Sequence, residues 1–135
     1  MKKYENIHEL KLDIDTKMKY TKLTNILCEK TNALRKLNPK TEIYAVFNIF
    51  RTHKGYHVYI AFSTNAKLTS RDIVALQLIY GSDPAREIHN LERIDKHIKN
   101  WNVLFTEKYK VKLKNDSLKL GKKISVEKYA GSFIY

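Results

Sequence analysis

Apolar and polar residues alternate near the start of the chain. In 8–16 every second residue from Leu10 to Ile14 is apolar, and charged residues stand between them. A period of two predicts a strand with one buried face. In 21–38 the apolar residues recur at every third or fourth position instead, which predicts an amphipathic helix.

The middle of the chain predicts a β-hairpin and a second helix. Residues 42–52 and 56–62 are rich in β-branched and aromatic side chains, so each predicts a strand. Only 53–55 separates them, which predicts a tight turn. A second amphipathic helix is predicted at 68–81, ending at Gly81.

The last part of the pattern leaves one choice open. Residues 82–84 predict a turn, but 85–95 fits either a helix or a short strand followed by a helix. Residues 102–113 predict a final strand. The order β-α-β-β-α-β predicts an α+β fold of the split βαβ or RRM-like type, an antiparallel sheet with helices on one face and the other face open.

Length and composition predict the number of domains and the cellular setting. A chain of 135 residues fits one domain. We expect a single domain at 1–135, with an RRM-like core at 8–108 and a basic segment at 108–135. The sequence contains no bilayer-spanning apolar run and no signal-peptide pattern, so we expect a cytoplasmic protein without a membrane partner (in the host cytoplasm if a virus encodes it). Cys28 is the only cysteine, which argues against a disulfide and against zinc.

The charge of the chain indicates a polyanionic partner. It carries 26 Lys and Arg against 14 Asp and Glu, a formal net charge of +12. We therefore expect binding to DNA or RNA, either single-stranded or as a primer-template. The alternating lysines of 108–114 would share one strand face and follow a phosphate backbone, although they could also guard an exposed sheet edge. These candidates are Lys108, Lys110, Lys112 and Lys114.

Two short motifs suggest chemistry. Asp13 and Asp15 are two residues apart on the first strand, so both leave the same face, and Mg²⁺ or Mn²⁺ would relieve their repulsion. The alternative is a solvated polar face. At the hairpin tip, Gly55 would let a phosphate approach the backbone, while Lys54 and His57 supply a charge and a hydrogen-bond donor. The alternative there is an ordinary turn beside a half-exposed histidine.

A D-x-D strand followed by a helix and a hairpin carrying "THKGYH" resembles the archaeo-eukaryotic primase superfamily. This superfamily includes the primase-polymerases of archaeal plasmids and viruses and the polymerase domain of bacterial ligase D. Asp13 and Asp15 match its first motif. Its second motif is matched by Thr52, which stands where a serine is usual, together with Lys54, Gly55 and His57.

The resemblance implies template-directed nucleotidyl transfer. Asp13, Asp15 and His57 would be the catalytic residues, and the two aspartates would hold Mg²⁺ or Mn²⁺. Thr52, Lys54, Gly55 and His57 would bind the phosphates of a nucleoside triphosphate. The chain is too short for the zinc-binding insert and the helical module of larger members, so on the resemblance it would be a minimal catalytic core, a subunit that works with a partner replication subunit, or a relic domain retained for binding.

The third motif of the family departs from its usual form here. Asn90 stands where an aspartate is expected to complete the metal site, and the carboxylates nearby are alternatives to it, namely Asp83, Glu92 and Asp95. On the resemblance, Arg86 and Arg93 would contact the nucleotide; the alternative is a solvated helix face.

Two other functions remain open from the sequence. The first is a non-catalytic single-stranded nucleic-acid-binding module that stacks bases on strand aromatics, for which Tyr44, Phe50, Tyr56 and Tyr59 are the candidates. The second is a protein like the rolling-circle replication initiators. That chemistry needs a pair of histidines on one strand, whereas "HVY" at 57–59 offers one.

Overall fold

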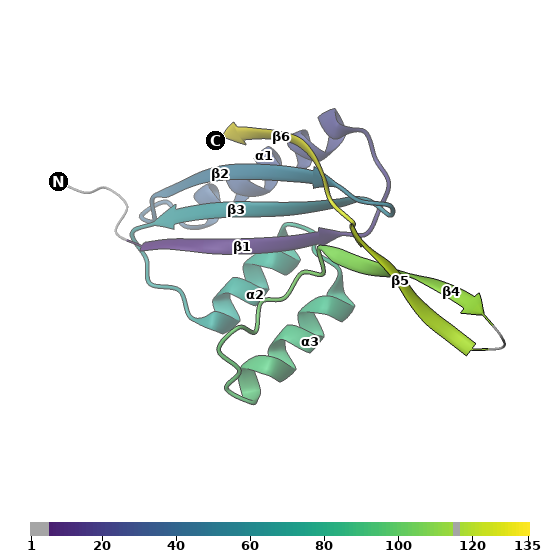
Figure 1. Cartoon of the computed structure of the whole chain (residues 1–135). Helices are drawn as coiled ribbons and strands as arrows, with labels where there is room; N and C mark the ends of the chain where they lie inside the picture. The colour runs from purple at the N-terminus through teal and green to yellow at the C-terminus, as the bar shows by residue number, and fades with distance from the viewer. Residues whose placement is uncertain (1–5, 115–116) are drawn as a thin grey trace.

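The computed structural model describes residues 6–114 and 117–135, and the side chains of 6–106 and 125–135 (Figure 1). The elements follow in the order β1 (Asn6–Ile14), α1 (Tyr20–Leu37), β2 (Ile43–Arg51), β3 (Tyr56–Thr64), α2 (Ser70–Ile79), α3 (Pro84–Asp95), β4 (Glu107–Lys114), β5 (Ser117–Ser125) and β6 (Lys128–Ile134). The choice left open at 85–95 is settled as a helix. No helix in the described residues combines the length and the apolar character that a bilayer crossing requires.

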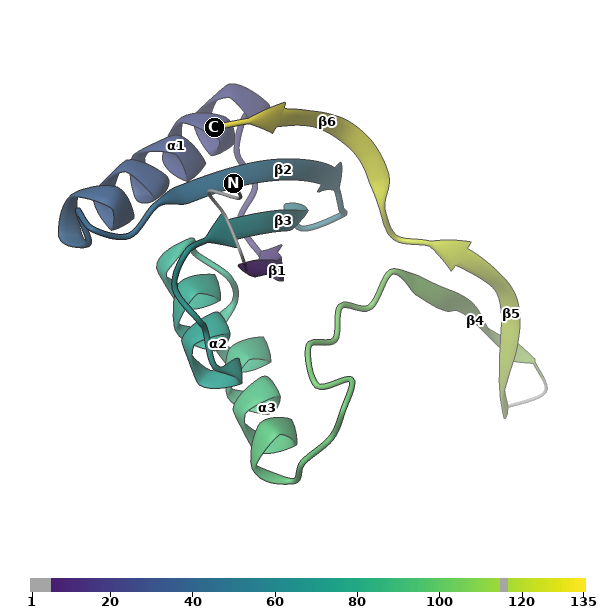
Figure 2. The same cartoon turned by 90° about the vertical axis from the view of Figure 1, so that its left-hand side faces the viewer.

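Four strands form an antiparallel sheet in the order β1-β3-β2-β6. Helices α1 and α2 lie on one face of it, and α3 packs against α2 beside β1 (Figure 2). This arrangement confirms the predicted α+β class and is compatible with an RRM-like split βαβ fold.

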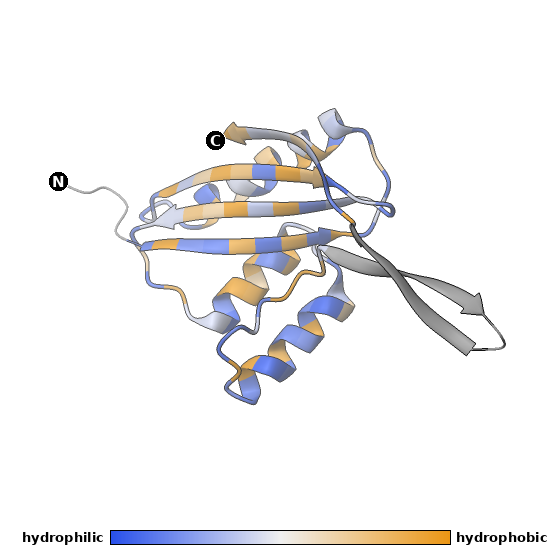
Figure 3. Ribbon diagram, in the orientation of Figure 1, coloured by the Kyte–Doolittle hydropathy of each residue, from blue (hydrophilic) through white to orange (hydrophobic). Residues whose placement is uncertain are grey.

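Alternation along the strands separates the two faces of the sheet. On the face toward α1 and α2, apolar side chains such as Leu12, Phe47 and Ile60 are fully buried together with Leu27 of α1. Hydrophobic and hydrophilic positions alternate along β1 in Figure 3 for this reason. The opposite face has no helix over it and carries the polar residues on which the site depends.

The strand predicted at 102–113 is confirmed in part, but it does not join the main sheet. Residues predicted as strand 102–113 begin as irregular chain, and β4 pairs with β5 in a separate two-stranded sheet that projects from the body (Figures 1 and 2). The fourth strand of the main sheet is β6, which pairs with β2 and lies outside the core predicted at 8–108.

Side chains and loop backbone, rather than a strand, cover the outer edge of β1. Because an edge strand has unpaired N–H and C=O groups, whatever buries it must supply hydrogen-bond partners. Four bonds do so: Lys11 N–H donates to Gln77 Oε1 (2.9 Å), Asp13 N–H to Ser82 Oγ (3.0 Å), Arg86 Nη1 to the Lys11 carbonyl (2.7 Å) and Asp83 N–H to the Asp13 carbonyl (2.7 Å). These contacts hold α2, α3 and the link between them along the outer edge of β1.

Candidate functional site

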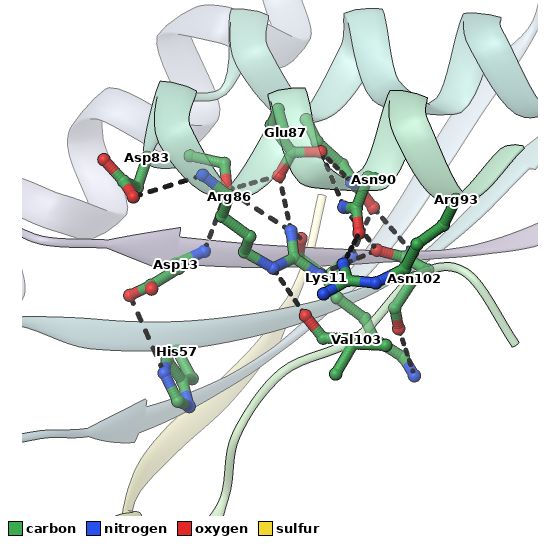
Figure 4. A network of polar contacts seen from close by, with 12 residues as sticks. Lys11, Asp13, His57, Asp83, Arg86, Glu87, Asn90, Arg93, Asn102 and Val103 are labelled. Atoms are coloured by element: carbon green, nitrogen blue, oxygen red, sulfur yellow. Dashed lines mark hydrogen bonds and ion pairs between the residues drawn. The ribbon is translucent and has the colours of Figure 1, made fainter. Parts of the chain in front are cut away.

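The structure brings Asp13 and His57 together. They are directly opposite each other in the antiparallel pairing of β1 with β3, so their side chains leave the same, helix-free face. The His57 Nε2 lies 3.7 Å from Asp13 Oδ1 (Figure 4). Strand alternation and the hairpin therefore place two residues that are far apart in the sequence in one small site.

A cavity of about 250 Å³ opens beside this pair, and we call it the β1 pocket. The end of β1 and the start of β3 form one wall, α3 forms another, and the segment 103–105 closes the third side. Its polar lining consists of Asp13, His57, Asp83, Arg86, His89 and Arg93. Phe105, whose side chain is 76% exposed, adds an aromatic ring at the rim.

Glu127 holds the other side of the His57 ring. Its Oε2 lies 2.7 Å from His57 Nδ1 and also accepts a hydrogen bond from the Tyr59 hydroxyl. Burial, reinforced by this bond to a carboxylate, raises the pKa of Tyr59. With Nδ1–H donating to Glu127, the Nε2 atom of His57 faces Asp13 and the pocket.

Glu127 was missed by the sequence analysis. It lies between β5 and β6, 70 residues after His57, in a stretch that the sequence presents only as basic. The pairing of β6 with β2 brings it there, and β6 was not predicted. Within the basic segment 108–135, Glu127 is one of two acidic residues, the other being Asp116, and this was the only signal available.

The negative charge of the Asp13 carboxylate has no hydrogen-bonded partner of opposite charge among the described residues. It is half-buried, and this loss of hydration raises its pKa, with His57 acting in the opposite direction and the negative charge of Asp15 adding to the rise. The His57 Nε2 atom lies beyond hydrogen-bond distance from Asp13 Oδ1, at 3.7 Å. A carboxylate in this condition favours a cation or a proton at its oxygens.

The other predicted metal ligands occupy different positions. Asp15 lies beyond the end of β1, where it is exposed and does not line the β1 pocket. Asn90 is buried away from that lining: its Nδ2 donates to Glu87 Oε1 (3.0 Å), and its Oδ1 accepts from Arg93 (3.0 Å). The carboxylate that does accompany Asp13 in the pocket is Asp83, which also caps α3 by accepting from the N–H of Arg86.

The remaining alternatives to Asn90 have partners elsewhere. Asp95 forms an exposed ion pair with Arg71, and Glu92 lies 3.7 Å from His89. Among the described residues, no group of three or more His, Cys, Asp or Glu side chains is arranged to hold a metal ion. A cation bound at Asp13 and Asp83 would therefore need oxygens from a ligand and from water, which is the usual environment of Mg²⁺ beside phosphates.

Arg86 belongs to a buried polar network that spans α2, α3 and β1 (Figure 4). Every nitrogen of its guanidinium has a protein acceptor: Nε donates to the Val103 carbonyl (2.8 Å), Nη2 to Asn102 Oδ1 (2.7 Å), and Nη1 to Lys11 and Glu87. Burial lowers the pKa of Arg86, and the Glu87 carboxylate counteracts this. The network fixes the pocket walls and occupies the guanidinium of Arg86. Of the two arginines expected to contact nucleotide, Arg93 is therefore the better placed, since it lines the pocket and is only partly buried.

The predicted phosphate-binding turn is divided between two places. His57 lines the β1 pocket, whereas Thr52 and Gly55 line a second cavity, the turn pocket, at the tip of the β2–β3 hairpin. Lys54 is exposed at the same tip. A Cβ on Gly55 would lie 1.9 Å from the Ile14 carbonyl oxygen, so the close approach that requires glycine is made by the chain's own backbone.

The four lysines predicted to bind nucleic acid are on β4, and their side chains lie outside the described residues. These are Lys108, Lys110, Lys112 and Lys114.

Comparison of the chain with protein-family models, with curated proteins and with solved structures gives no match. The fold and the site geometry are therefore the basis for assigning a function.

Proposed function

We propose that the protein is a primase-polymerase-like nucleotidyltransferase that binds nucleic acid and a nucleoside triphosphate, with the β1 pocket as its reaction centre. The observation that carries the proposal is the meeting of Asp13 and His57 on the helix-free face, 3.7 Å apart and lining one pocket with Asp83 and Arg93. One residue of each motif, Asp13 of the first and His57 of the second, lines this pocket, which supports the proposal.

The pocket supplies complementary charge for a triphosphate. Arg93 lies in the pocket wall beside His89, where its side chain is only partly buried and its guanidinium donates to Asn90. The volume of about 250 Å³ is below that of pockets that enclose whole small ligands, so phosphates would fill it and the base would lie outside, against Phe105.

Asp13 and Asp83 would hold a divalent cation between them and the phosphates. The fit rests on the geometry of Asp13, a half-buried carboxylate in the pocket wall, 3.7 Å from His57 Nε2, whose pKa burial raises. When bound, Mg²⁺ or Mn²⁺ neutralises phosphate charge and favours deprotonation of the attacking hydroxyl. His57, held through Nδ1 by Glu127, presents Nε2 to the pocket, where it would face the phosphate oxygens.

The test is nucleotide incorporation on a primed template with Mn²⁺. We expect Asp13→Asn and Asp83→Asn each to reduce the rate about 100-fold or more, since each removes a charge aimed at the reacting phosphates. Asp15→Asn is the matched control: it removes the same charge two residues away, outside the pocket, and should retain most of the activity. Incorporation that survives Asp13→Asn in a folded protein would overturn the assignment.

A second candidate is a non-catalytic single-stranded nucleic-acid-binding module, and a row of rings on the helix-free face favours it. Phe50 packs edge-on against Tyr59 and Tyr129, with centroid distances of 5.5 Å in both pairs, and the Tyr129 side chain is 61% exposed. Such rings offer faces on which bases stack. An inactive protein that binds oligothymidylate, and loses affinity on Tyr129→Ala, would select this function.

A further inference from the structure

The turn pocket is a cavity of about 290 Å³ at the same end of the sheet as the β1 pocket. It lies where the tip of the β2–β3 hairpin meets the link between β1 and α1. Its basic side chains come from three places: Lys17 from the link, Arg51 from the end of β2 and His53 from the turn.

The charge of the turn pocket is uncompensated. No carboxylate lines it, and of the ion pairs between described residues none includes Lys17, Arg51 or His53. All three residues are exposed, and the pairing of β6 with β2 adds Lys128 opposite Arg51. The β1 pocket differs in this respect, because two aspartates accompany its basic residues.

The backbone around the turn pocket is held in place by packing. Gly55 lies directly against the backbone of Ile14 and Thr16, and the buried Tyr56 donates its hydroxyl hydrogen to the Met18 carbonyl (2.8 Å). Inside the turn, Thr52 N–H donates to the Gly55 carbonyl (2.9 Å). The hairpin tip is thus fixed to the β1–α1 link, which reduces the ordering that an anion would otherwise impose.

The guanidinium of Arg51 is positioned by a contact with the buried ring of Tyr56. Its guanidinium carbon lies 5.4 Å from the centroid of the Tyr56 ring, a cation–π distance. This contact keeps the head group near the cavity without occupying its hydrogen-bond donors with a carboxylate.

We propose that the turn pocket binds a backbone phosphate of a nucleic-acid strand; the proposal rests on the nucleic-acid partner of the proposed function. A phosphodiester needs only cationic donors, which the cavity supplies. A nucleoside triphosphate arrives with a metal ion that favours carboxylates, and those are in the β1 pocket. Tyr56 lines one cavity and the next residue, His57, lines the other, so both cavities lie at the same end of the sheet, although these two side chains leave opposite faces of β3.

The experiment measures binding of a fluorescent oligothymidylate at several salt concentrations, without nucleotide or metal ion. Removing one phosphate-binding charge should lower the slope of log affinity against log salt by about 0.7, so Lys17→Gln with Arg51→Gln should lower it by about 1.4. Lys17→Gln alone, which leaves the interaction between Arg51 and Tyr56 intact, should give half of that change. The charge-matched control is Lys22→Gln with Lys36→Gln, two exposed positions on α1.

The outcomes separate this proposal from the function on which it rests. A slope change confined to Lys17 and Arg51 supports the site even if no variant incorporates nucleotide. Equal changes in the control, no change, or no binding by the unaltered protein would overturn it. A separate measurement adds ATP with Mn²⁺ as a competitor of the oligothymidylate. If the Lys17/Arg51 variant loses that competition while its salt slope is unchanged, the pocket belongs to the nucleotide and the proposal is overturned.

Discussion

The two edges of the main sheet are covered in different ways. At the β2 edge the covering element is a strand, β6, which satisfies the backbone through ordinary antiparallel pairing. At the β1 edge the covering groups are Gln77, Ser82, Asp83 and Arg86 from the α2–α3 region. A paired strand lies directly against its neighbour and leaves no space between them. A helix that reaches the edge through its side chains stands farther from β1, which leaves space for the β1 pocket.

Each edge also supplies residues to the site from a distant part of the sequence. The β1 edge supplies the pocket walls through α3. The β2 edge supplies Glu127, because β6 begins at the residue that follows it. His57 lies on β3 between these edges and contacts a carboxylate from each side, Asp13 and Glu127.

The largest expected effect is the loss of the buried carboxylate of the β1 edge. Glu87 is fully buried and contacts Arg86, Gln77, Ser82 and Asn90. Glu87→Ala would leave the Arg86 guanidinium buried without its counter-charge, and we expect the free energy of unfolding to fall by about 3–5 kcal/mol. Chemical denaturation measures this. Glu92→Ala, on the exposed side of the same helix, should stay within about 0.5 kcal/mol, and comparable losses in both variants would contradict the role of the network.

The same network marks where sequence could and could not predict the structure. Periodicity identified β1, α1, β2, β3 and α2, whereas the pairing of β1 with β3, which puts Asp13 opposite His57, is seen only in the structure. In α3 the pattern misleads, since Ile88 of the apparent apolar stripe is 57% exposed while Glu87 and Asn90 are fully buried.

The reason is the partner of that helix. An edge strand offers polar backbone groups, so the helix that covers it turns its polar side inward, and no single-sequence rule states which strand will be at the edge. The segment of β6, "KYAGSFI", is short and contains a glycine, so it gives a weak strand signal. Glu127 depends on β6 and was hidden for the same reason.

The β2 edge should be more tolerant, because apolar packing holds it. Phe133 of β6 stacks on the buried Phe47 with centroids 4.6 Å apart. We expect Phe133→Ala to cost about 2 kcal/mol, less than a fully buried phenylalanine because Phe133 is only partly covered. Ile134→Ala, at a side chain that is 60% exposed, is the control and should change stability little. If Phe133→Ala lowers the free energy of unfolding as much as Glu87→Ala does, the two edges do not differ in their tolerance of substitution.

Glu127 connects the β2 edge to the site, so its loss should affect His57 more than the fold. We expect Glu127→Ala to cost about 1.5–3 kcal/mol through the hydrogen bonds of a charged group. Incorporation should fall about 10-fold or more, as for other residues that orient a functional histidine. Imidazole ¹⁵N shifts should change from one dominant tautomer of His57 to a mixture, which a purely structural role would not produce.

Two variants sharpen that measurement. Glu127→Gln keeps an acceptor for Nδ1–H and should restore part of the tautomer preference. Tyr59→Phe removes the other bond to Glu127 while leaving the contact with His57, so it should change the shifts little. Equal effects of Tyr59→Phe and Glu127→Ala would mean that Glu127 stabilises the sheet face without orienting His57.

The smallest expected effect is a gain in stability from Asp13→Asn. Burial raises the pKa of Asp13 above its ordinary value of 3.8, so the folded state binds the proton more tightly than the unfolded chain does. The free energy of unfolding therefore decreases as pH rises from below 3.8 through the higher folded-state pKa. Asparagine has no such titration, and above that window the variant should be more stable, by about 0.5 kcal/mol or less since solvent reaches the carboxylate.

Denaturation curves between about pH 3 and about pH 7, a range that spans carboxyl titration, test this directly. Asp15→Asn, at an exposed carboxylate nearby, should lower the pKa of Asp13 by removing a like charge and should reduce the same pH dependence without abolishing it. A loss of stability in Asp13→Asn at neutral pH would mean that the carboxylate contributes to the fold. A gain in stability together with lost incorporation would identify Asp13 as a charge maintained for function at a cost to folding.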